Sequence, residues 1–168
     1  MTADQVKKLL SLEPHPREGG WFRRTYEAAE KIPAASLAAS RYPSPRRTGT
    51  AIFYLLEPDT FSEMHRLRSD EIFHFYAGDP VELLQLHPDG TGTVSILGND
   101  LFAGQRPQLV VNQDTWQGSR LIRGGAWALL GCTVSPGFEY EDYESGKRKE
   151  LTVKWPDFAT LIAALTHS

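Results

Sequence analysis

The sequence has little of several features that would narrow its function at once. It contains a single cysteine, Cys132, so it cannot form an internal disulfide and is not typical of a disulfide-stabilised secreted scaffold. Its formal net charge is −3, which argues against the broad basic surface that nucleic acids or anionic lipids attract. No apolar run approaches the roughly 20 residues of a transmembrane helix. We therefore expect neither a nucleic-acid partner nor a membrane partner.

The sequence also lacks a secretory signal, because Lys7 and Lys8 interrupt the early apolar stretch. The expected location is the cytoplasm. There are no internal repeats and no low-complexity tail, and 168 residues suffice for one domain, residues 1–168, with a core that needs neither disulfides nor metals. Short charge clusters, at Arg46-Arg47 and in the acidic run of residues 139–144, are expected to be solvated.

Helical signals are confined to the two ends. Thr2 and Gln5 stand at capping-box spacing before an apolar pattern, which predicts a short amphipathic helix over residues 3–12. Pro156 begins a second predicted helix. Residues 27–47 are rich in Ala, Ser and Pro and predict a long loop with one helical turn near residues 36–39. Loops of this length are uncommon in compact domains and often cover a site.

Most of the remaining chain consists of short apolar runs between turn residues. The first predicted strand follows the paired glycines Gly19 and Gly20 and ends at Tyr26. The later predicted strands span residues 50–56, 61–67, 72–76, 81–87, 93–97, 108–111, 116–122 and 126–134. The Pro-Asp-Gly sequence at 88–90 is a strong hairpin signal. Many short strands with few helices indicate an all-β, antiparallel sandwich or barrel.

One stretch, residues 63–78, concentrates titratable groups between apolar, aromatic-rich runs. It contains two histidines, three carboxylates and two arginines, and it ends at Gly78. An ordinary strand surface has little use for such a concentration of charge. We interpret the stretch as the wall of a small-molecule site inside a β-barrel.

The spacing of His65, Glu71 and Gly78 resembles the first motif of the cupin superfamily, in which a His is followed by a second His, a Glu and a Gly. Here Leu67 stands where the second His would be. In the stretch that resembles the second cupin motif, Gln117 stands at the position of the His. The resemblance implies that the usual three-His-one-Glu metal set is reduced to His65 and Glu71, with Gln117 as a weak third donor.

Five short motifs in one order resemble, more closely, a family of small single-domain cupins that are mostly uncharacterised. They are Glu-Gly-Gly-aromatic-Phe at 18–22, His-Arg at 65–66, Asp-Glu at 70–71, Trp-Gln at 116–117 and Pro-Gly-Phe at 136–138. The resemblance covers roughly residues 5–145, with the barrel core at about 18–145. It implies a double-stranded β-helix (jelly-roll) barrel with short terminal helices, usually in a homodimer. It also implies a relation in fold to plant storage proteins and sugar-nucleotide epimerases, but it supplies no reaction.

Strand alternation assigns the candidate side chains around His65 to two faces. If His65 faces the barrel interior, the residues that share its face are Phe61, Glu63 and Leu67. Met64 would then face outward. A shift of the register by one residue would exchange the two faces.

The same rule applies to the next strand. If Glu71 faces inward, Phe73 and Phe75 do so as well, and His74 faces the outer layer or a dimer partner. The interior would then be a pocket with aromatic walls and a few converging polar groups. The predicted ligand-binding side chains are Glu63, Phe73, Phe75, Trp116 and Gln117.

The first of three alternatives for the chemistry is acid–base catalysis on a small polar metabolite, with no cofactor required. A His beside a carboxylate in a partly apolar pocket can titrate near neutral pH. His65 would be the base and Glu71 its orienter, or the reverse, and Tyr140 would supply an acid from the far side. The corresponding reaction class is proton abstraction next to a carbonyl, as in isomerases and epimerases of this fold.

The second alternative is a non-catalytic protein that binds a small molecule in the same pocket. The third is a metal-dependent lyase or oxygenase, in which His65, Glu71 and Gln117 hold a divalent ion such as Zn, Fe, Ni or Mn. The sequence does not identify the ligand.

Overall fold

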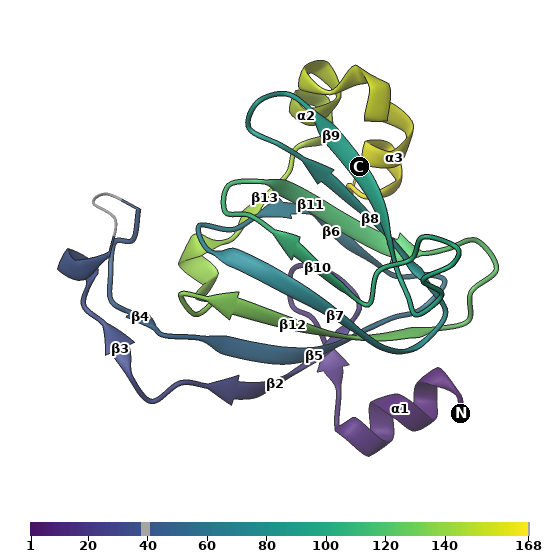
Figure 1. Cartoon of the computed structure of the whole chain (residues 1–168), viewed down its shortest axis with the longest axis horizontal. Helices are drawn as coiled ribbons and strands as arrows, with labels where there is room; N and C mark the ends of the chain where they lie inside the picture. The colour runs from purple at the N-terminus through teal and green to yellow at the C-terminus, as the bar shows by residue number, and fades with distance from the viewer. Residues whose placement is uncertain (38–40, 168) are drawn as a thin grey trace.

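Two antiparallel sheets that face each other make up most of the molecule (Figure 1). The computed structural model describes residues 1–37 and 41–167. The larger sheet has six strands in the order β1-β2-β5-β12-β7-β10, and the smaller has five in the order β13-β6-β11-β8-β9. A separate two-stranded ribbon pairs β3 with β4.

The strands are β1 (Glu13–Pro14), β2 (Trp21–Glu27), β3 (Lys31–Ile32), β4 (Arg46–Arg47), β5 (Thr50–Leu56), β6 (Phe61–Arg66), β7 (Asp70–Gly78), β8 (Val81–Leu86), β9 (Gly92–Leu97), β10 (Gln108–Val111), β11 (Trp116–Leu121), β12 (Ala128–Ser135) and β13 (Glu144–Ser145). The α-helices are α1 (Ala3–Leu10), α2 (Arg148–Lys154) and α3 (Ala159–Ala164). Short 3-10 turns are η1 (Ala34–Ser36), η2 (Tyr140–Asp142) and η3 (Pro156–Phe158).

This arrangement confirms the predicted all-β fold with short terminal helices. The capping box at the start of α1 is formed as expected, with Thr2 accepting from the backbone of Gln5. Helix α2 was not predicted, because its seven residues bury only Leu151 and its start lacks a side-chain cap. The predicted helical turn at 36–39 lies largely outside the described residues, and η1 forms just before it.

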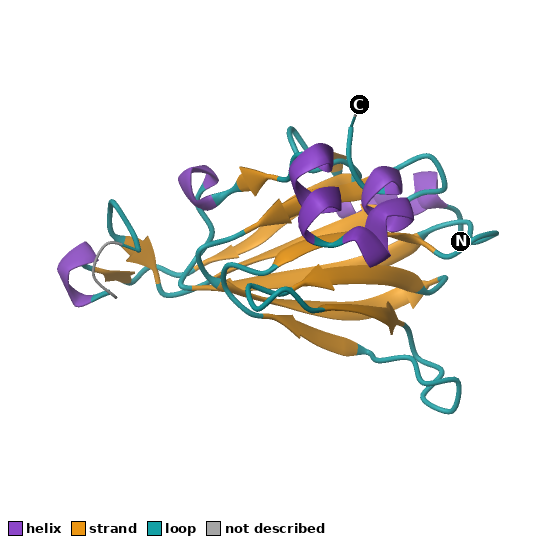
Figure 2. Cartoon of the chain, turned by 90° about the horizontal axis from the view of Figure 1, so that it is seen from above, coloured by secondary structure: helices purple, strands orange, loops and turns teal. Residues whose placement is uncertain are grey.

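The core between the two sheets is apolar. Side chains from both sheets meet there, among them Tyr54 of β5, Phe73 of β7, Leu83 of β8 and Leu130 of β12, all at most 1% exposed. Helices α2 and α3 cover the outer face of the smaller sheet, as Figure 2 shows from above. Met64 points outward into that second apolar layer, as alternation predicted.

A bulge in β6 changes which of its residues face the interior. Gln117 of β11 pairs with His65, but Ser119 pairs with Ser62, so the register shifts between them. Phe61 consequently packs in the outer layer with the C-terminal helices and does not share the face of His65. The prediction for Phe61 was wrong because simple alternation assumes an unbroken ladder.

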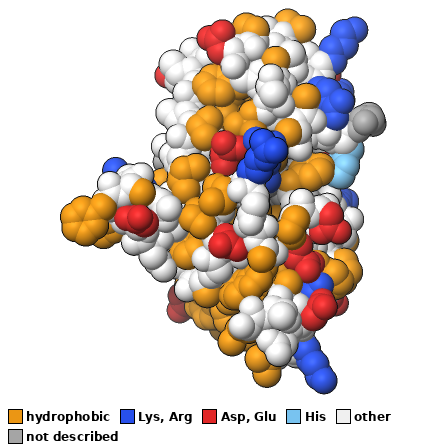
Figure 3. All heavy atoms as spheres, turned by 90° about the vertical axis from the view of Figure 1, so that its right-hand side faces the viewer, with side chains coloured by type: hydrophobic (Ala, Val, Ile, Leu, Met, Phe, Trp, Pro, Cys, Tyr) orange, Lys and Arg blue, Asp and Glu red, His pale blue; other side chains and the backbone are white. Residues whose placement is uncertain are grey.

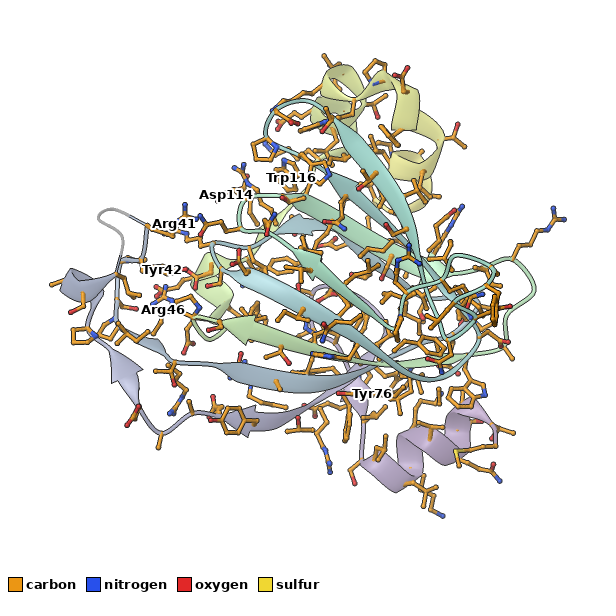
Figure 4. All side chains as sticks on the ribbon, viewed as in Figure 1. Arg41, Tyr42, Arg46, Tyr76, Asp114 and Trp116 are labelled. Atoms are coloured by element: carbon orange, nitrogen blue, oxygen red, sulfur yellow. The ribbon has the colours of Figure 1, made fainter. Side chains whose placement is uncertain are left out.

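The segment between β3 and the start of β5 is fastened to the turn η2 and to the loops that join β6 to β7 and β10 to β11. Arg46 is fully buried and makes a two-point contact with Asp142, with both nitrogen–oxygen distances at 2.7 Å. Tyr42 donates to the backbone oxygen of Arg68, and Arg41 binds Asp114 (Figure 4). The sequence suggested that Arg46 and Asp142 are solvated charges. They instead form a buried ion pair.

Among the described residues, no helix is long and apolar enough to cross a membrane. Figure 3 faces the end of the molecule toward which β5 and β7 run. Charged side chains of both signs are mixed there with apolar ones, and no single sign dominates that face.

Candidate functional site

A cleft opens at the end of the barrel where β7 begins and β12 ends. Its lining comes from both sheets and from the segment before β2, and its empty volume is about 440 Å³, counting the part that is open to solvent. The lining residues are His15, Glu18, Phe22, Arg24, Thr50, Ile52, His65, Leu67, Glu71, Cys132, Val134, Phe138 and Tyr140. The predicted pair His65 and Glu71 thus shares one cavity.

Glu71 is a buried carboxylate held by an amide. Gln117 donates from Nε2 to Oε2 of Glu71 at 2.7 Å, and both side chains lie in the interior. Burial disfavours the charged carboxylate, and the negative charge of Glu18 adds to this, so the pKa of Glu71 rises from 4.5 to about 7. His65 and the amide of Gln117 oppose the rise. Glu71 can therefore both release and accept a proton near neutral pH.

His65 is oriented without any bond to Glu71. Its Nδ1 lies 2.8 Å from the backbone oxygen of Glu63, and its ring stacks on that of Tyr143 with the centroids 4.8 Å apart. The ring is 1% exposed, and Nε2 has no hydrogen-bond partner among the described residues. The expectation that Glu71 orients His65 therefore does not match the geometry, because each group has its own support.

Two further titratable residues line the cleft, His15, which was not singled out from the sequence, and Glu18, which was noted only as the first residue of the motif at 18–22. Nε2 of His15 lies 3.8 Å from Oε2 of Glu18, and the two side chains are 4% and 12% exposed. Ser62, which the bulge in β6 turns toward this region, donates to Oε1 of Glu18. Burial lowers the pKa of His15, although the charge of Glu18 opposes this. The signal in the sequence was the Glu-Gly-Gly motif that begins at Glu18.

The rim and the side of the cleft carry aromatic and basic groups. Tyr140 lines the cleft as predicted, but from the turn η2, and it is 37% exposed. Arg17 lies over its ring at 5.3 Å, and Arg24 is bonded to Glu27 nearby. Cys132 is buried beside Glu71, and burial holds the pKa of its thiol well above the usual value, so it is expected to stay protonated.

Several residues predicted as ligand-binding do not line the cleft. Phe73 and Phe75 face inward but lie deeper, in the apolar core. Glu63 is occupied by hydrogen bonds from Tyr143 and Ser145, each at 2.7 Å. Trp116 faces outward, partly buried against the helices, with Arg66 over its ring (Figure 4). Trp116 and Gln117 are adjacent in β11, so only one of them can face the interior.

The long segment of residues 27–47 does not cover the cleft either. None of its described residues is part of the lining. It is fastened instead to the neighbouring turn η2 through Arg46.

The donors around Glu71 do not fit the metal set that the superfamily uses. Leu67 lines the cleft where a second His would stand, and Gln117 turns its amide nitrogen, not its oxygen, toward Glu71. Within the described part of the chain, no three His, Cys, Asp or Glu residues are placed to hold one ion. We therefore derive no step through a metal.

The chain is similar to two solved structures over nearly its whole length. Protein SO0799 from Shewanella oneidensis is 32% identical, with a TM-score of 0.85, and the match covers 99% of this chain and 98% of that one. A hypothetical protein from Leishmania major is 28% identical, with a TM-score of 0.89 and full coverage of both chains.

More distant similarities show the fold alone. An oxalate decarboxylase of Bacillus subtilis, OxdC, is 11% identical with a TM-score of 0.54, and the match covers 93% of this chain and 38% of that one.

Among curated proteins, the uncharacterised protein YML079W of Saccharomyces cerevisiae is 27% identical over 134 residues, which span 76% of this chain and 67% of that protein. The model of the family described as Cupin superfamily (DUF985) matches residues 4–146. The chain belongs to this family of the cupin superfamily.

Proposed function

We propose that the cleft binds a small polar metabolite and moves a proton on it, in a reaction of the isomerase or epimerase type. The observation that carries the proposal is geometric. His65 and Glu71 are both buried, both line one cleft, and each is fixed by a separate partner. Such an arrangement leaves Nε2 of His65 and the carboxyl group of Glu71 to act on a bound molecule.

The electrostatics support the same role. A general acid or base works best when its pKa lies near the working pH. The pKa of Glu71, raised by burial to about 7, meets that condition. Keeping a carboxyl group buried beside another carboxylate lowers stability, and groups of this kind are concentrated at functional sites.

A non-catalytic binding protein is the second candidate. The cleft is small and has aromatic and basic groups at its mouth, which suits binding alone as well as it suits catalysis. The two functions differ in one respect: only the enzyme needs His65 and Glu71 to move a proton of the bound molecule.

Solvent exchange separates these candidates. Small hydroxy-aldehydes, hydroxy-ketones and hydroxy-acids, with and without a phosphate group, would be incubated with the protein in D2O and analysed by mass spectrometry. We expect one or more compounds to gain deuterium at the carbon next to the carbonyl. Glu71→Gln should slow this exchange about 100-fold or more, because proton transfer by a positioned group contributes on that order.

The matched control is Glu144→Gln, which changes an exposed carboxylate paired with Arg66 outside the cleft and should leave exchange unchanged. If the compounds raise the melting temperature but none exchanges, the protein is a binder and the enzymatic proposal fails. If Glu71→Gln exchanges as fast as the parent chain, Glu71 has no role in the chemistry.

We also propose that the protein forms a homodimer through the outer face of the larger sheet. Among the described residues, no helix covers Tyr76 and Val110 on this face, and each is 49% exposed. The ring of Tyr76, labelled in Figure 4, stacks on that of His74. Light scattering should give twice the chain mass, and Tyr76→Glu should reduce it to a monomer. A monomeric parent chain would contradict this proposal without affecting the cleft.

A further inference from the structure

The segment that carries His15 and Glu18 is locked onto the barrel by its backbone. The backbone nitrogen of Glu63 donates to the oxygen of Glu18 at 2.9 Å, and the hydroxyl of Tyr54 donates to the oxygen of Gly19 at 2.8 Å. Gly19 and Gly20 have φ values of 97° and 67°, which side chains rarely allow. A Cβ on Gly20 would lie 2.8 Å from the backbone oxygen of Leu55. The two glycines therefore permit the close approach that places His15 in the cleft.

The hydrogen bonds of His15 determine which of its nitrogens carries the proton. Nδ1 receives the backbone N–H of Glu18 at 2.8 Å and that of Arg17 at 3.4 Å. A backbone N–H can only donate, so Nδ1 is unprotonated and the neutral ring has its proton on Nε2. At 3.8 Å from Glu18, Nε2 is too far away for a hydrogen bond to that carboxylate. The N–H at Nε2 is thus available to a molecule in the cleft.

His65 shows the opposite arrangement. Its Nδ1 lies 2.8 Å from the backbone oxygen of Glu63, which can only accept, so Nδ1 carries the proton. The lone pair is then on Nε2. In their neutral forms, His15 offers a donor and His65 an acceptor at Nε2 in the same cleft.

We propose that His15 is a catalytic residue that donates its Nε2–H to the carbonyl oxygen of the substrate, while His65 accepts the proton from the adjacent carbon. This inference rests on the proposed function and narrows the substrate to a small compound with a C–H next to an aldehyde or ketone. A carbonyl oxygen is the acceptor that a neutral imidazole N–H fits, and the C–H beside it is made acidic by the same contact.

The step balances without a co-reactant. The C–H bond breaks, and its proton moves to Nε2 of His65. The electron pair of that bond forms a C=C bond, and the carbonyl π pair moves onto the oxygen, where the Nε2–H of His15 stabilises the charge. Return of a proton to carbon restores a carbonyl compound. Glu71 lies in the same cleft and can exchange the proton of His65 with solvent.

Tyr140, the acid expected from the sequence, is less suited to this role. It lies at the rim and is 37% exposed, whereas the side chain of His15 is 4% exposed. A hydrogen bond to a developing oxyanion is strongest where water is excluded. The backbone N–H at position 18 fixes the ring of His15.

The first test needs no ligand. The chain has five histidines, so 15N-histidine labelling gives a spectrum that His15→Gln and His65→Gln can assign. At pH 7 we expect the proton on Nε2 of His15 and on Nδ1 of His65. The same tautomer on both rings, or a charged His15, would overturn the inference whatever the activity of the protein.

The second test uses deuterium exchange into the compounds of the panel described above. His15→Phe keeps a ring of similar shape but removes the donor, and should slow exchange by about 100-fold to 1,000-fold. His15→Gln keeps an N–H donor and should recover part of that loss. His87→Gln, on the turn after β8, is the matched control and should not change the rate.

The outcomes distinguish the two proposals. If the parent chain exchanges no compound, the proposed function and this inference both fail. If the parent chain exchanges but His15→Phe keeps a rate within about threefold of it, only the inference fails. If His15→Phe slows exchange and His15→Gln recovers part of the lost rate, His15 acts through its N–H donor and not through its shape.

Discussion

The same strands build two different interiors in this barrel. On β7, Glu71 lines the cleft, whereas Phe73, two residues further on, is 1% exposed in the apolar core. On β12, Val134 lines the cleft and Leu130 is fully buried in the core. One half of the barrel buries apolar surface and stabilises the fold. The other half holds carboxylates and imidazoles, and burying these groups lowers the stability of the fold. The packed half must offset that cost.

The largest effect is expected in the packed half. Leu130→Ala removes a fully buried side chain and should lower the free energy of unfolding by about 3 kcal/mol, through lost burial and a cavity. Urea denaturation measures this loss. The matched change Leu9→Ala, at a residue that is 71% exposed, should cost less than about 0.5 kcal/mol. Equal effects at the two positions would mean that this half is not the stabilising one.

In the cleft half, Glu71→Gln should stabilise the protein at high pH. The pKa of Glu71 is about 7 in the folded protein, against an ordinary value of 4.5. Below pH 4.5 both states hold the proton. Between pH 4.5 and 7 the unfolded chain releases it first, so the free energy of unfolding falls, and the loss is complete above pH 7.

Glu71→Gln removes this loss, which amounts to up to about 3 kcal/mol. The difference between the variant and the parent chain should therefore grow from pH 4.5 to pH 7 and then stay constant, as measured by denaturation at each pH. The groups that face Glu71 are Glu18, His65, Gln117 and Cys132. A difference independent of pH would show that Glu71 is not held protonated by burial.

A smaller effect is expected outside both halves. Thr2→Ala removes the side-chain cap of α1 and should cost about 1 kcal/mol, without altering exchange in the cleft. Thermal unfolding followed by circular dichroism measures this cost. A change in the exchange rate would mean that α1 acts on the site, which no contact of the cleft indicates.

The smallest expected effect concerns the coupling of the two cleft carboxylates. The charge of Glu18 is one cause of the raised pKa of Glu71, secondary to burial, so Glu18→Gln should lower that pKa. Carbon-13 NMR of labelled glutamate side chains follows the titration directly. An unchanged pKa of Glu71 would mean that the two carboxylates do not interact electrostatically and that burial alone raises the pKa of Glu71.

The sequence could predict much of this structure, because the relevant patterns are local. The runs at Thr50–Leu56 and Gln108–Val111 have the bounds of their strands, and alternation assigns Glu71, Phe73 and His74 to the correct faces of β7. The part of β7 from Asp70 to Phe75 keeps a regular ladder with β12, so its side chains alternate as the pattern assumes.

The errors arise where long-range geometry decides. The bulge in β6 turns Phe61 outward, and nothing in its own stretch marks that shift. His15 reaches the cleft only because a backbone with positive φ passes close to β5 and β6. Arg46 has the composition of a solvated loop residue, but a carboxylate 96 positions away pairs with it. Each case depends on a contact distant in sequence.

The tight passage at Gly19 and Gly20 places two ionisable groups of the cleft in a segment that lies outside the long strands. A chain shortened to begin at Trp21 would keep every long strand but would lose both His15 and Glu18. A protein compared with this one only across the long strands could then appear alike and still lack both side chains. The short segment before the first long strand therefore supplies part of the cleft chemistry that the long strands alone do not determine.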